Sequence, residues 1–238
     1  MGISREQVVE TAIRLLDEVG LEGLTLRRLA AELDVQAPAL YWHVRDKREL
    51  LDLMAEAIVA TTRPPSLGRP AHGQPWWAWL AERARAARRA LLAHRDGALV
   101  AAGNRPTADA LPEIERVLAE LVAVGFPPAE ALHSVLALGA YVGGSALEEQ
   151  AEANRSEEDR ERDHELALRL RDRDRYPTLA AAAAGLTGGE DTFEVGLRLL
   201  IDGLRARHAE LHGLPFGAAA TTSTVSDASA GRIGPLSG

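Results

Sequence analysis

The chain has 238 residues, of which 46% are hydrophobic, 27 are Lys or Arg and 35 are Asp or Glu, so its formal net charge is -8. This length and composition can supply a sizeable core in one or two domains. The lack of cysteine excludes disulfides and cysteine-based zinc sites. No apolar run reaches membrane-spanning length and the N-terminus is not typical of a signal peptide, so we expect a cytoplasmic protein that does not contact membranes.

The N-terminal part of the chain has the pattern of short helices joined by tight connections. Ser4, Thr25 and Asp46 have side chains that can accept hydrogen bonds from backbone N–H groups at helix starts, and Gly20 can end a helix. Pro38 suits the first turn of a helix, where its missing N–H would have no intrahelical partner. We therefore expect a helix, then a helix-turn-helix, then a long connecting helix.

The charge of this region differs from that of the whole chain. Between residues 25 and 48, five basic side chains outnumber three acidic ones, which gives +2: Arg27, Arg28, Arg45, Lys47 and Arg48 against Glu32, Asp34 and Asp46. A basic patch on an acidic protein suits a bounded contact with DNA, because phosphate neutralisation needs only the docking face to be basic. On charge alone, a solvated subdomain with ordinary surface arginines is an equally good interpretation.

The rest of the chain predicts further helices and several irregular segments. Helices are expected over 47–61, 76–94, 109–124, 129–150 and 192–211. The proline-rich segment 62–75 is typical of a loop, and 95–107 can bend or rewind because it contains glycines. The charged segment 151–177 indicates a mobile loop or an exposed helix, and the composition of 217–238 indicates disorder.

Three of the four tryptophans lie together at the start of the expected helix 76–94. Trp76, Trp77 and Trp79 could pack the core or form the wall of a ligand cavity. We favour core packing, because aromatic clusters at helical spacing more often bury apolar area than bind a ligand.

Three stretches carry a family resemblance: LTLRRLAAELDVQAPALYWHVRDKRELLDLM at 24–54, ALLAHRDGALVAAGNRPT at 90–107 and GFPPAEALHSVLALGAYVGGSALEEQ at 125–150. Together they resemble the tetracycline-repressor family of transcriptional regulators. The resemblance implies an all-α fold with a three-helix helix-turn-helix DNA-binding head, a larger helical ligand-binding and dimerisation body, and a disordered tail; the expected bounds are 1–48, 49–211 and 212–238. It also implies a repressor without cofactor or enzymatic activity. Such a repressor binds double-stranded palindromic operator DNA as a homodimer, responds to a small-molecule effector and controls an efflux or resistance gene.

The resemblance assigns a DNA-binding role to ten residues: Arg27, Arg28, Gln36, Ala37, Pro38, Ala39, Tyr41, Trp42, His43 and Lys47. Arg27 matches the family arginine that reaches a base edge, where its guanidinium fits guanine. Tyr41, His43 and Lys47 match positions that touch the DNA backbone. Ala37 replaces a glutamine and Leu26 a threonine of the tetracycline-binding members, so we expect a different operator sequence. Leu40 and Trp42 are expected mainly to pack the head.

The resemblance also places a ligand pocket in the body. Its expected residues are Arg63, Arg83, Ala87, Ala101, Asn104, Arg105, Pro106, Val117 and Glu148, the last contributed by the partner subunit. Ala101 replaces the imidazole that coordinates magnesium in the tetracycline-binding members, and Ala87 replaces a phenylalanine. We therefore expect no magnesium–tetracycline chelate. A roomier cavity with Arg63 and Arg83 at its rim would suit a larger, flat or partly anionic natural product, such as an aromatic polyketide.

Dimerisation is expected through two helices of each subunit, which would form a four-helix bundle. The residues that would let the helices pack are Leu136, Gly139, Ala140, Gly143 and Gly144 on one helix and Leu197, Leu200, Ile201 and Leu204 on the other. In a monomer the leucine stripe would remain in water.

Other functions have weaker support in the sequence. His208 and His212 are one helical turn apart, but a lone pair is weak support for a metal, and no metal site is predicted. An enzyme using Glu148, Arg105 and His94 as an acid–base set is a remote alternative without a recognisable catalytic motif. An activator or global regulator that binds DNA with an unrelated ligand remains a second alternative.

Overall fold

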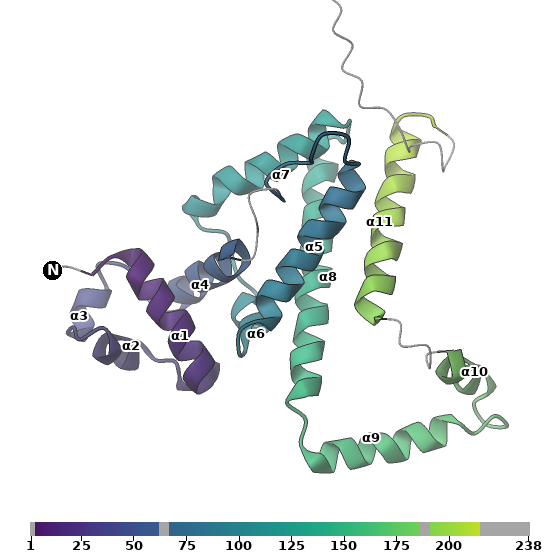
Figure 1. Cartoon of the computed structure of the whole chain (residues 1–238), viewed down its shortest axis with the longest axis horizontal. Helices are drawn as coiled ribbons and strands as arrows, with labels where there is room; N and C mark the ends of the chain where they lie inside the picture. The colour runs from purple at the N-terminus through teal and green to yellow at the C-terminus, as the bar shows by residue number, and fades with distance from the viewer. Residues whose placement is uncertain (1–2, 62–66, 186–190, 215–238) are drawn as a thin grey trace, which may run out of the picture.

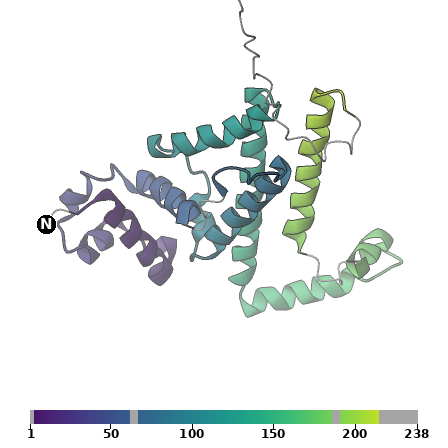
Figure 2. The same cartoon turned by 45° about the horizontal axis from the view of Figure 1, so that its top comes forward.

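The computed structural model describes residues 3–61, 67–185 and 191–214. Within these residues the chain is helical and contains no strand, so the expected all-α class is confirmed. Figures 1 and 2 show a small N-terminal group of helices at one side of a larger body, with an arm of two helices that extends away from both. Residues 217–238, expected to be disordered, lie outside the described residues.

The N-terminal head consists of α1 (Arg5–Gly23), α2 (Leu26–Glu32) and α3 (Ala37–Leu40), and α4 (Lys47–Thr61) leads into the body. The Ser4 hydroxyl accepts from Gln7 N, and the Gln7 side chain accepts from Ser4 N, which forms a capping box. Thr25 accepts from Arg28 N, and Asp46 accepts from Glu49 N, so the predicted caps are confirmed.

The break expected at Gly20 is present inside α1. Gly20 has φ 72°, which interrupts the helix before a last turn that ends at Gly23. A second left-handed residue, Asp34 at φ 52°, makes the tight turn between α2 and α3. These two turns set the crossing of α1, α2 and α3.

The core of the head continues into the body through α4. Leu16, Leu29 and Leu40 are buried in the head, and Met54 and Ile58 are buried on α4. The expected boundary between residues 48 and 49 falls inside α4, so the two parts share one helix. A displacement of this helix must therefore reach the head.

The body is built around α5, which packs against α4, α6, α8 and α11. Its helices are α5 (Trp76–Leu92), α6 (Gly97–Ala101), the short 3-10 helix η2 (Ala108–Ala110), α7 (Leu111–Ala123), α8 (Pro128–Ala153) and α11 (Thr192–Leu211). In Figure 1, α5, α8 and α11 run side by side, and α7 crosses near one end of them.

The tryptophans of α5 pack the body core, as predicted. Trp76 and Trp79 are buried, and Trp76 makes an edge contact with Phe126. The indole N–H of Trp79 donates to the Leu67 carbonyl at 3.0 Å. Trp77 is partly buried, and the Arg205 guanidinium lies over its ring at 4.8 Å from the centroid.

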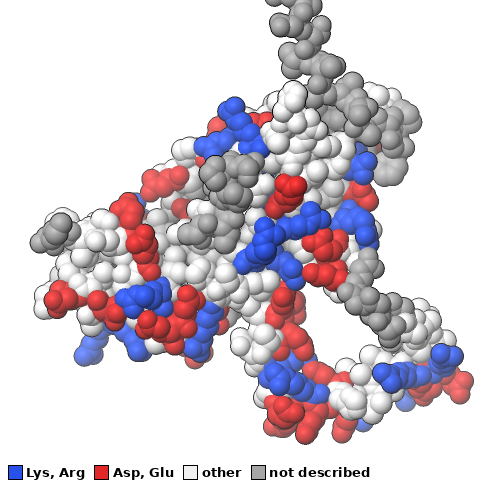
Figure 3. All heavy atoms as spheres, viewed as in Figure 1, with Lys and Arg blue, Asp and Glu red and all other residues white. Residues whose placement is uncertain are grey.

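The charged segment forms an exposed helix. It contains α9 (Glu157–Leu170), within which no residue is buried, followed by α10 (Pro177–Gly185). Acidic and basic atoms are mixed along α9 in Figure 3, and ion pairs such as Arg162–Glu158 join successive turns. Of the two structures expected for 151–177, the exposed helix is the one observed.

The predicted dimer face of α11 is partly wrong. Leu197 and Ile201 are buried inside the same subunit, because this side of α11 packs on α5 and α8. The most exposed leucine of α11 is Leu199, which is 69% exposed, and the most exposed leucine of α8 is Leu136, which is 59% exposed. Periodicity identified an apolar stripe but not which side of the helix meets its own subunit.

Helix length and hydropathy decide whether a segment of the described residues could cross a membrane. There, no single helix is long and apolar enough to cross a membrane, although η2–α7 and α8 pass by length and composition when taken together as a pair bent by 119°.

Candidate functional site

The outer surface of α2 and α3 presents most of the predicted DNA-binding residues. Seven of the ten are exposed: Arg27, Arg28, Gln36, Ala37, Pro38, Tyr41 and Trp42; Ala39, His43 and Lys47 are partly buried. α3 begins with small residues and leaves no bulky side chain at its tip before Tyr41. This surface can therefore approach another molecule closely.

The basic residues of the head differ in whether an acid neutralises them. Arg45 pairs with Glu49 at 3.0 Å and Arg48 pairs with Asp52 at 2.6 Å. The pKa of Glu49 is lowered, first because its carboxylate accepts from the Arg45 backbone N–H. By contrast, Arg27 forms no ion pair within the described ranges of the chain. The charge available to an external anion is thus concentrated on α2.

Trp42 does not pack the head, contrary to the prediction. Its side chain is 89% exposed, whereas Leu40 is 0% exposed. α3 ends at Leu40, and the chain then turns through Tyr41–His43. Helical periodicity therefore no longer places Trp42 on the face that Leu40 buries. An exposed tryptophan beside an exposed tyrosine is a surface suited to contact rather than to folding.

Lys47 has a structural contact besides its expected role. Its ammonium donates to the carbonyl of Leu21 at 3.3 Å, which joins the start of α4 to the end of α1. His43 accepts through its backbone carbonyl from Arg5 Nε at 3.1 Å. Both residues therefore lie where they also brace the head.

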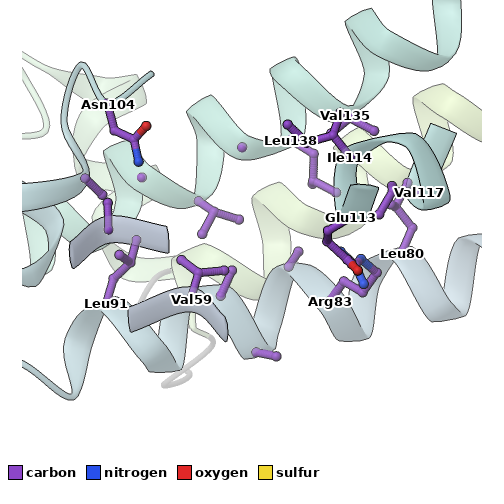
Figure 4. A pocket seen from close by; sticks show the side chains of 18 residues that line it. Val59, Leu80, Arg83, Leu91, Asn104, Glu113, Ile114, Val117, Val135 and Leu138 are labelled. Carbon is purple, nitrogen blue, oxygen red and sulfur yellow. The ribbon is translucent and has the colours of Figure 1, made fainter. Parts of the chain in front are cut away.

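A cavity of about 360 Å³ lies in the body between five helices (Figure 4). Its size falls within the range of small-molecule sites. It is lined by Ala55 and Val59 of α4, Leu80, Arg83, Ala84, Ala86, Ala87 and Leu91 of α5, Ala101 of α6, Asn104, Glu113, Ile114 and Val117 of α7 and the loop before it, and Val135, Leu138, Gly139, Val142 and Gly143 of α8. The lining includes none of the tryptophans.

The polar side chains of the cavity are few and lie at its ends. Arg83 and Glu113 point toward one another at one end in Figure 4, and Asn104 lies at the other. Arg83 donates to Glu113 at 3.0 Å and to the Leu67 carbonyl at 2.6 Å. Glu113 also forms an ion pair with Arg116, so one carboxylate is shared by two guanidinium groups and compensates the charge of Arg83 only in part.

The predicted ligand residues divide into three groups. Arg83, Ala87, Ala101, Asn104 and Val117 line the cavity. Three others do not line it and are exposed: Arg105, Pro106 and Glu148. Arg63 lies outside the described residues.

Several lining residues were missed by the sequence analysis. Val135, Leu138 and Val142 follow helical spacing on α8, and this periodicity could have identified them as inward-facing. Glu113 gave no comparable signal, because an acid in the first turn of a helix is common for other reasons. Ala55 and Val59 were predicted to lie in the connecting helix 47–61 but not to line a cavity.

Magnesium does not fit this cavity. Ala101 offers no ligand at the position of the family imidazole, and among the described residues no group of three or more His, Asp or Glu could hold a metal ion. His208 instead bonds through Nε2 to the Val124 carbonyl at 2.8 Å and packs against Trp76 and Phe126. His94, a member of the acid–base set considered as a remote alternative, instead contacts Asp17 through Nδ1 at 2.9 Å.

The segment between α6 and α7 joins the cavity to α4. Arg48 donates to the Gly103 carbonyl at 2.6 Å, and Arg105 N donates to Asp52 at 3.1 Å. Thr107 donates to Glu56 through both its backbone N–H, at 2.6 Å, and its hydroxyl, at 2.8 Å. Asn104, which lines the cavity, lies within this bonded segment, so a change at Asn104 can be passed to α4.

Two protein-family models match the chain. The one described as "Bacterial regulatory proteins, tetR family" matches residues 8–54, and the one described as "Tetracyclin repressor-like, C-terminal domain" matches residues 69–208. The Escherichia coli tetracycline repressor protein class C is 41% identical over 202 residues, which cover 85% of this chain and 90% of that protein.

Solved structures show the same relationship. A variant of TetR from Acinetobacter baumannii in complex with minocycline is 36% identical, with a TM-score of 0.65, and the match covers 87% of this chain and 98% of that one. ActR from Streptomyces coelicolor in complex with actinorhodin is 30% identical, with a TM-score of 0.73, over 86% of this chain and 96% of that one.

Proposed function

The chain belongs to the tetracycline-repressor family of ligand-responsive transcriptional repressors, and from this premise we propose that it binds a palindromic operator as a homodimer and leaves it when a flat, largely apolar natural product fills the cavity. The relatives are transcriptional regulators rather than enzymes. We further propose that the controlled gene encodes an efflux pump or a resistance protein that acts on the same compound.

One observation carries the proposal: α4 is shared by the head and the cavity. α4 packs against α1, and Lys47 at its start donates to the Leu21 carbonyl, while Ala55 and Val59 in its second half form part of the cavity wall. The hydrogen bonds between α4 and the segment 102–107 add a second connection between cavity and head. A ligand that binds one position of α4 more tightly than another will change the spacing of the heads, and only this difference in affinity drives release.

The exposed face of α8 and α11 supports the homodimer. Leu136 and Leu199 are exposed there, and a Cβ added to Gly139, Gly144 or Gly203 would meet no atom within 4 Å. A large apolar side chain beside uncovered glycines suits close packing of two helices against a second copy. Two heads related by a two-fold axis would then read successive major grooves about 34 Å apart.

The ligand class rests on the cavity lining. Its wall consists mainly of Ala, Val, Leu and Gly, and Ala87 and Ala101 leave room for a broad, flat molecule. The complexes of TetR with minocycline and of ActR with actinorhodin give two compounds for a first test. Because Ala101 cannot coordinate magnesium, tetracycline with magnesium is expected to release the operator poorly.

The test is footprinting of the DNA upstream of the gene and of its divergent neighbour. Purified full-length protein should protect a palindromic site, and actinorhodin should remove the protection at a lower concentration than tetracycline with magnesium. The variant Ala87→Leu should keep the footprint and weaken the response to ligand by about tenfold, since it overfills the cavity. Ala119→Leu, at an exposed position of α7 outside the cavity lining, is the matched control. Protection that persists with ligand while transcription rises would contradict release as the mechanism.

A further inference from the structure

Arg5, the first residue of α1, contacts three other segments of the chain through its guanidinium group. Its Nε donates to the His43 carbonyl at 3.1 Å, in the turn that follows α3. Its Nη2 pairs at 3.4 Å with Glu49 of α4, a carboxylate that Arg45 shares, and its Nη1 pairs at 3.3 Å with Asp109 of η2. The rigid fork of a guanidinium suits contacts in several fixed directions. Each nitrogen of this group therefore has a partner in a different part of the same subunit.

The carbonyl that Arg5 binds belongs to a turn that carries three of the predicted DNA-binding residues: Tyr41, Trp42 and His43. α3 gives this turn little support, because the helix has only four residues. Within the turn, the backbone N–H groups of His43 and Val44 both donate to the Leu40 carbonyl. Arg5 adds a charged donor from another helix, in a partly buried contact. Because hydrogen bonds from charged donors are stronger than neutral ones, we expect Arg5 to restrain the turn.

The contact with Asp109 connects this turn to the body. Asp109 lies in η2, and Thr107, just before η2, donates to Glu56 of α4 through both its backbone N–H and its hydroxyl. α7 begins directly after η2, and Ile114 in its first turn lines the cavity. η2 thus lies between a segment fixed to α4 and a helix of the cavity wall. Through Arg5, the turn is tied to the body at a place other than α4.

We propose that Arg5 is a positioning residue for DNA recognition: it holds the turn Tyr41–His43 in place from inside the protein, and Asp109 of the body helps to hold Arg5. This inference rests on the proposed function only in taking the turn as a DNA-contacting surface. In this role Arg5 does not bind DNA phosphate, because its three nitrogens point to partners within the subunit. The side chains of Arg5 and Asp109 are 42% and 72% exposed, so their ion pair contributes less than the hydrogen bond to the turn.

Hydrogen exchange of the DNA-free, full-length protein tests the restraint on the turn. Relative to the N–H groups of α2, those of His43 and Val44 should exchange about tenfold faster in Arg5→Ala, as expected for loss of a hydrogen bond from a charged group. In Asp109→Ala they should exchange about two- to fivefold faster, the range for an exposed ion pair. Arg14→Ala is the matched control, because this arginine of α1 pairs with other carboxylates. Equal rates in Arg5→Ala and wild type would overturn the inference.

Operator binding over a salt series tests the consequence for recognition. Arg5→Ala should lower operator affinity by about tenfold without changing the salt slope, whereas loss of a phosphate-binding residue lowers the slope by about 1. Arg5→Lys keeps the charge but not the fork, so it should not restore the affinity. Asp109→Ala should lower affinity by about two- to fivefold, and the double variant should bind no more weakly than Arg5→Ala. Glu115→Ala, which removes an exposed acid of α7, should bind like wild type.

The results separate this inference from the proposed function. A lower salt slope in Arg5→Ala, full affinity in Arg5→Lys, or losses that add in the double variant would overturn the positioning role. If no operator is bound but exchange at the turn depends on Arg5 and Asp109, the proposed function fails and the restraint on the turn stands. If operator is bound and neither substitution changes affinity or exchange, the inference fails alone. Asp109→Ala, at an exposed position, decides if Arg5→Ala does not fold.

Discussion

Arg27 and Arg28 of the head differ from Arg83 of the cavity in whether the folded subunit supplies a carboxylate partner. Arg27 and Arg28 are exposed on α2 and form no ion pair with any residue in the described parts of the chain. Arg83 is mostly buried and forms an ion pair with Glu113 at 3.0 Å, a carboxylate that also pairs with Arg116. The difference lies in the partner that each guanidinium has in the folded subunit.

This difference indicates which surface has positive charge available to bind an anion. An uncompensated guanidinium on an exposed helix gains most from DNA phosphate or a base edge, and the counterions released from the DNA add to binding. A partly compensated guanidinium in an apolar wall gains less from a second anion, because it must lose part of its ion pair to bind one. In the proposed function, the charge of Arg27 and Arg28 would therefore be available to DNA, whereas the charge of Arg83 is already partly used within the subunit.

The largest expected effect comes from separating the two heads while leaving both regions intact. Leu136→Arg places a charge in the exposed face of α8 and should convert the proposed dimer to monomers, because the charge would be buried at the proposed subunit contact. Operator affinity should fall by about 10² to 10⁴, the usual gain from linking two binding modules. Light scattering and operator titration measure the two effects.

Leu111→Arg, at another exposed leucine of the body, is the control for this substitution. It should keep the dimer and the operator affinity. A dimer that survives Leu136→Arg would show that the subunits associate through another face.

A matched pair in the head distinguishes a packing residue from a contacting one. Leu40→Ala should lower the free energy of unfolding by about 2 to 5 kcal/mol, because Leu40 is fully buried. Trp42→Ala should change it by less than about 0.5 kcal/mol, because the side chain is exposed. Operator affinity of folded protein should fall for Trp42→Ala. Denaturant unfolding and operator titration give the two measurements, and a large loss of stability in Trp42→Ala would restore the packing role.

The contrast between Leu40 and Trp42 shows what the sequence could predict about the head. The caps at Ser4, Thr25 and Asp46 depend on neighbouring residues, so local chemistry was enough to place the helices. α3 has only four residues, too few for periodicity to define its buried face. The family resemblance, confirmed by the two matching models, predicted which surface contacts DNA but not the packing of each side chain.

The body was less predictable because its site is assembled from distant segments. Arg83 and Glu113 are 30 residues apart and meet only because α5 and α7 pack together. Likewise, the apolar stripe that contains Leu197 and Ile201 would look the same in the sequence whether it packed on its own subunit or on a partner subunit. The pattern of a single helix shows which of its faces is apolar. Which carboxylate pairs with an arginine, and which surface an apolar face contacts, follow only from the tertiary structure.

A smaller effect is expected from the two kinds of cation within the head. Arg27→Ala should relax the preference at one base of each half-site at a cost of about 1 to 3 kcal/mol. Lys47→Ala should weaken binding to all sequences alike and lower the salt slope by about 1. Binding measured on operator and random DNA over a salt series separates them. Equal losses on both DNAs for Arg27→Ala would remove its role as a base reader.

The smallest effect concerns a paired arginine of the body, Arg85, which contacts Glu194 of α11 at 2.7 Å. The hydrogen bond from Arg85 lowers the pKa of Glu194 below its ordinary value of 4.5. A carboxylate with a lowered pKa stabilises the folded state above its unfolded pKa, and this contribution is lost as pH falls through the folded pKa. Since both side chains are about 40% exposed, the contribution is about 0.2 to 1 kcal/mol.

Glu194→Gln should therefore be slightly less stable than wild type at neutral pH, and the two should converge in acid. Glu161→Gln on α9, whose carboxylate forms no ion pair among the described residues, should follow wild type throughout. Unfolding free energies measured over a pH series show the convergence. Operator affinity should not change in either variant, because the ion pair of Glu194 with Arg85 joins α5 to α11 and we do not expect it to contact DNA. A loss of operator affinity in Glu194→Gln alone would mean that paired charges of the body also set the position of the heads.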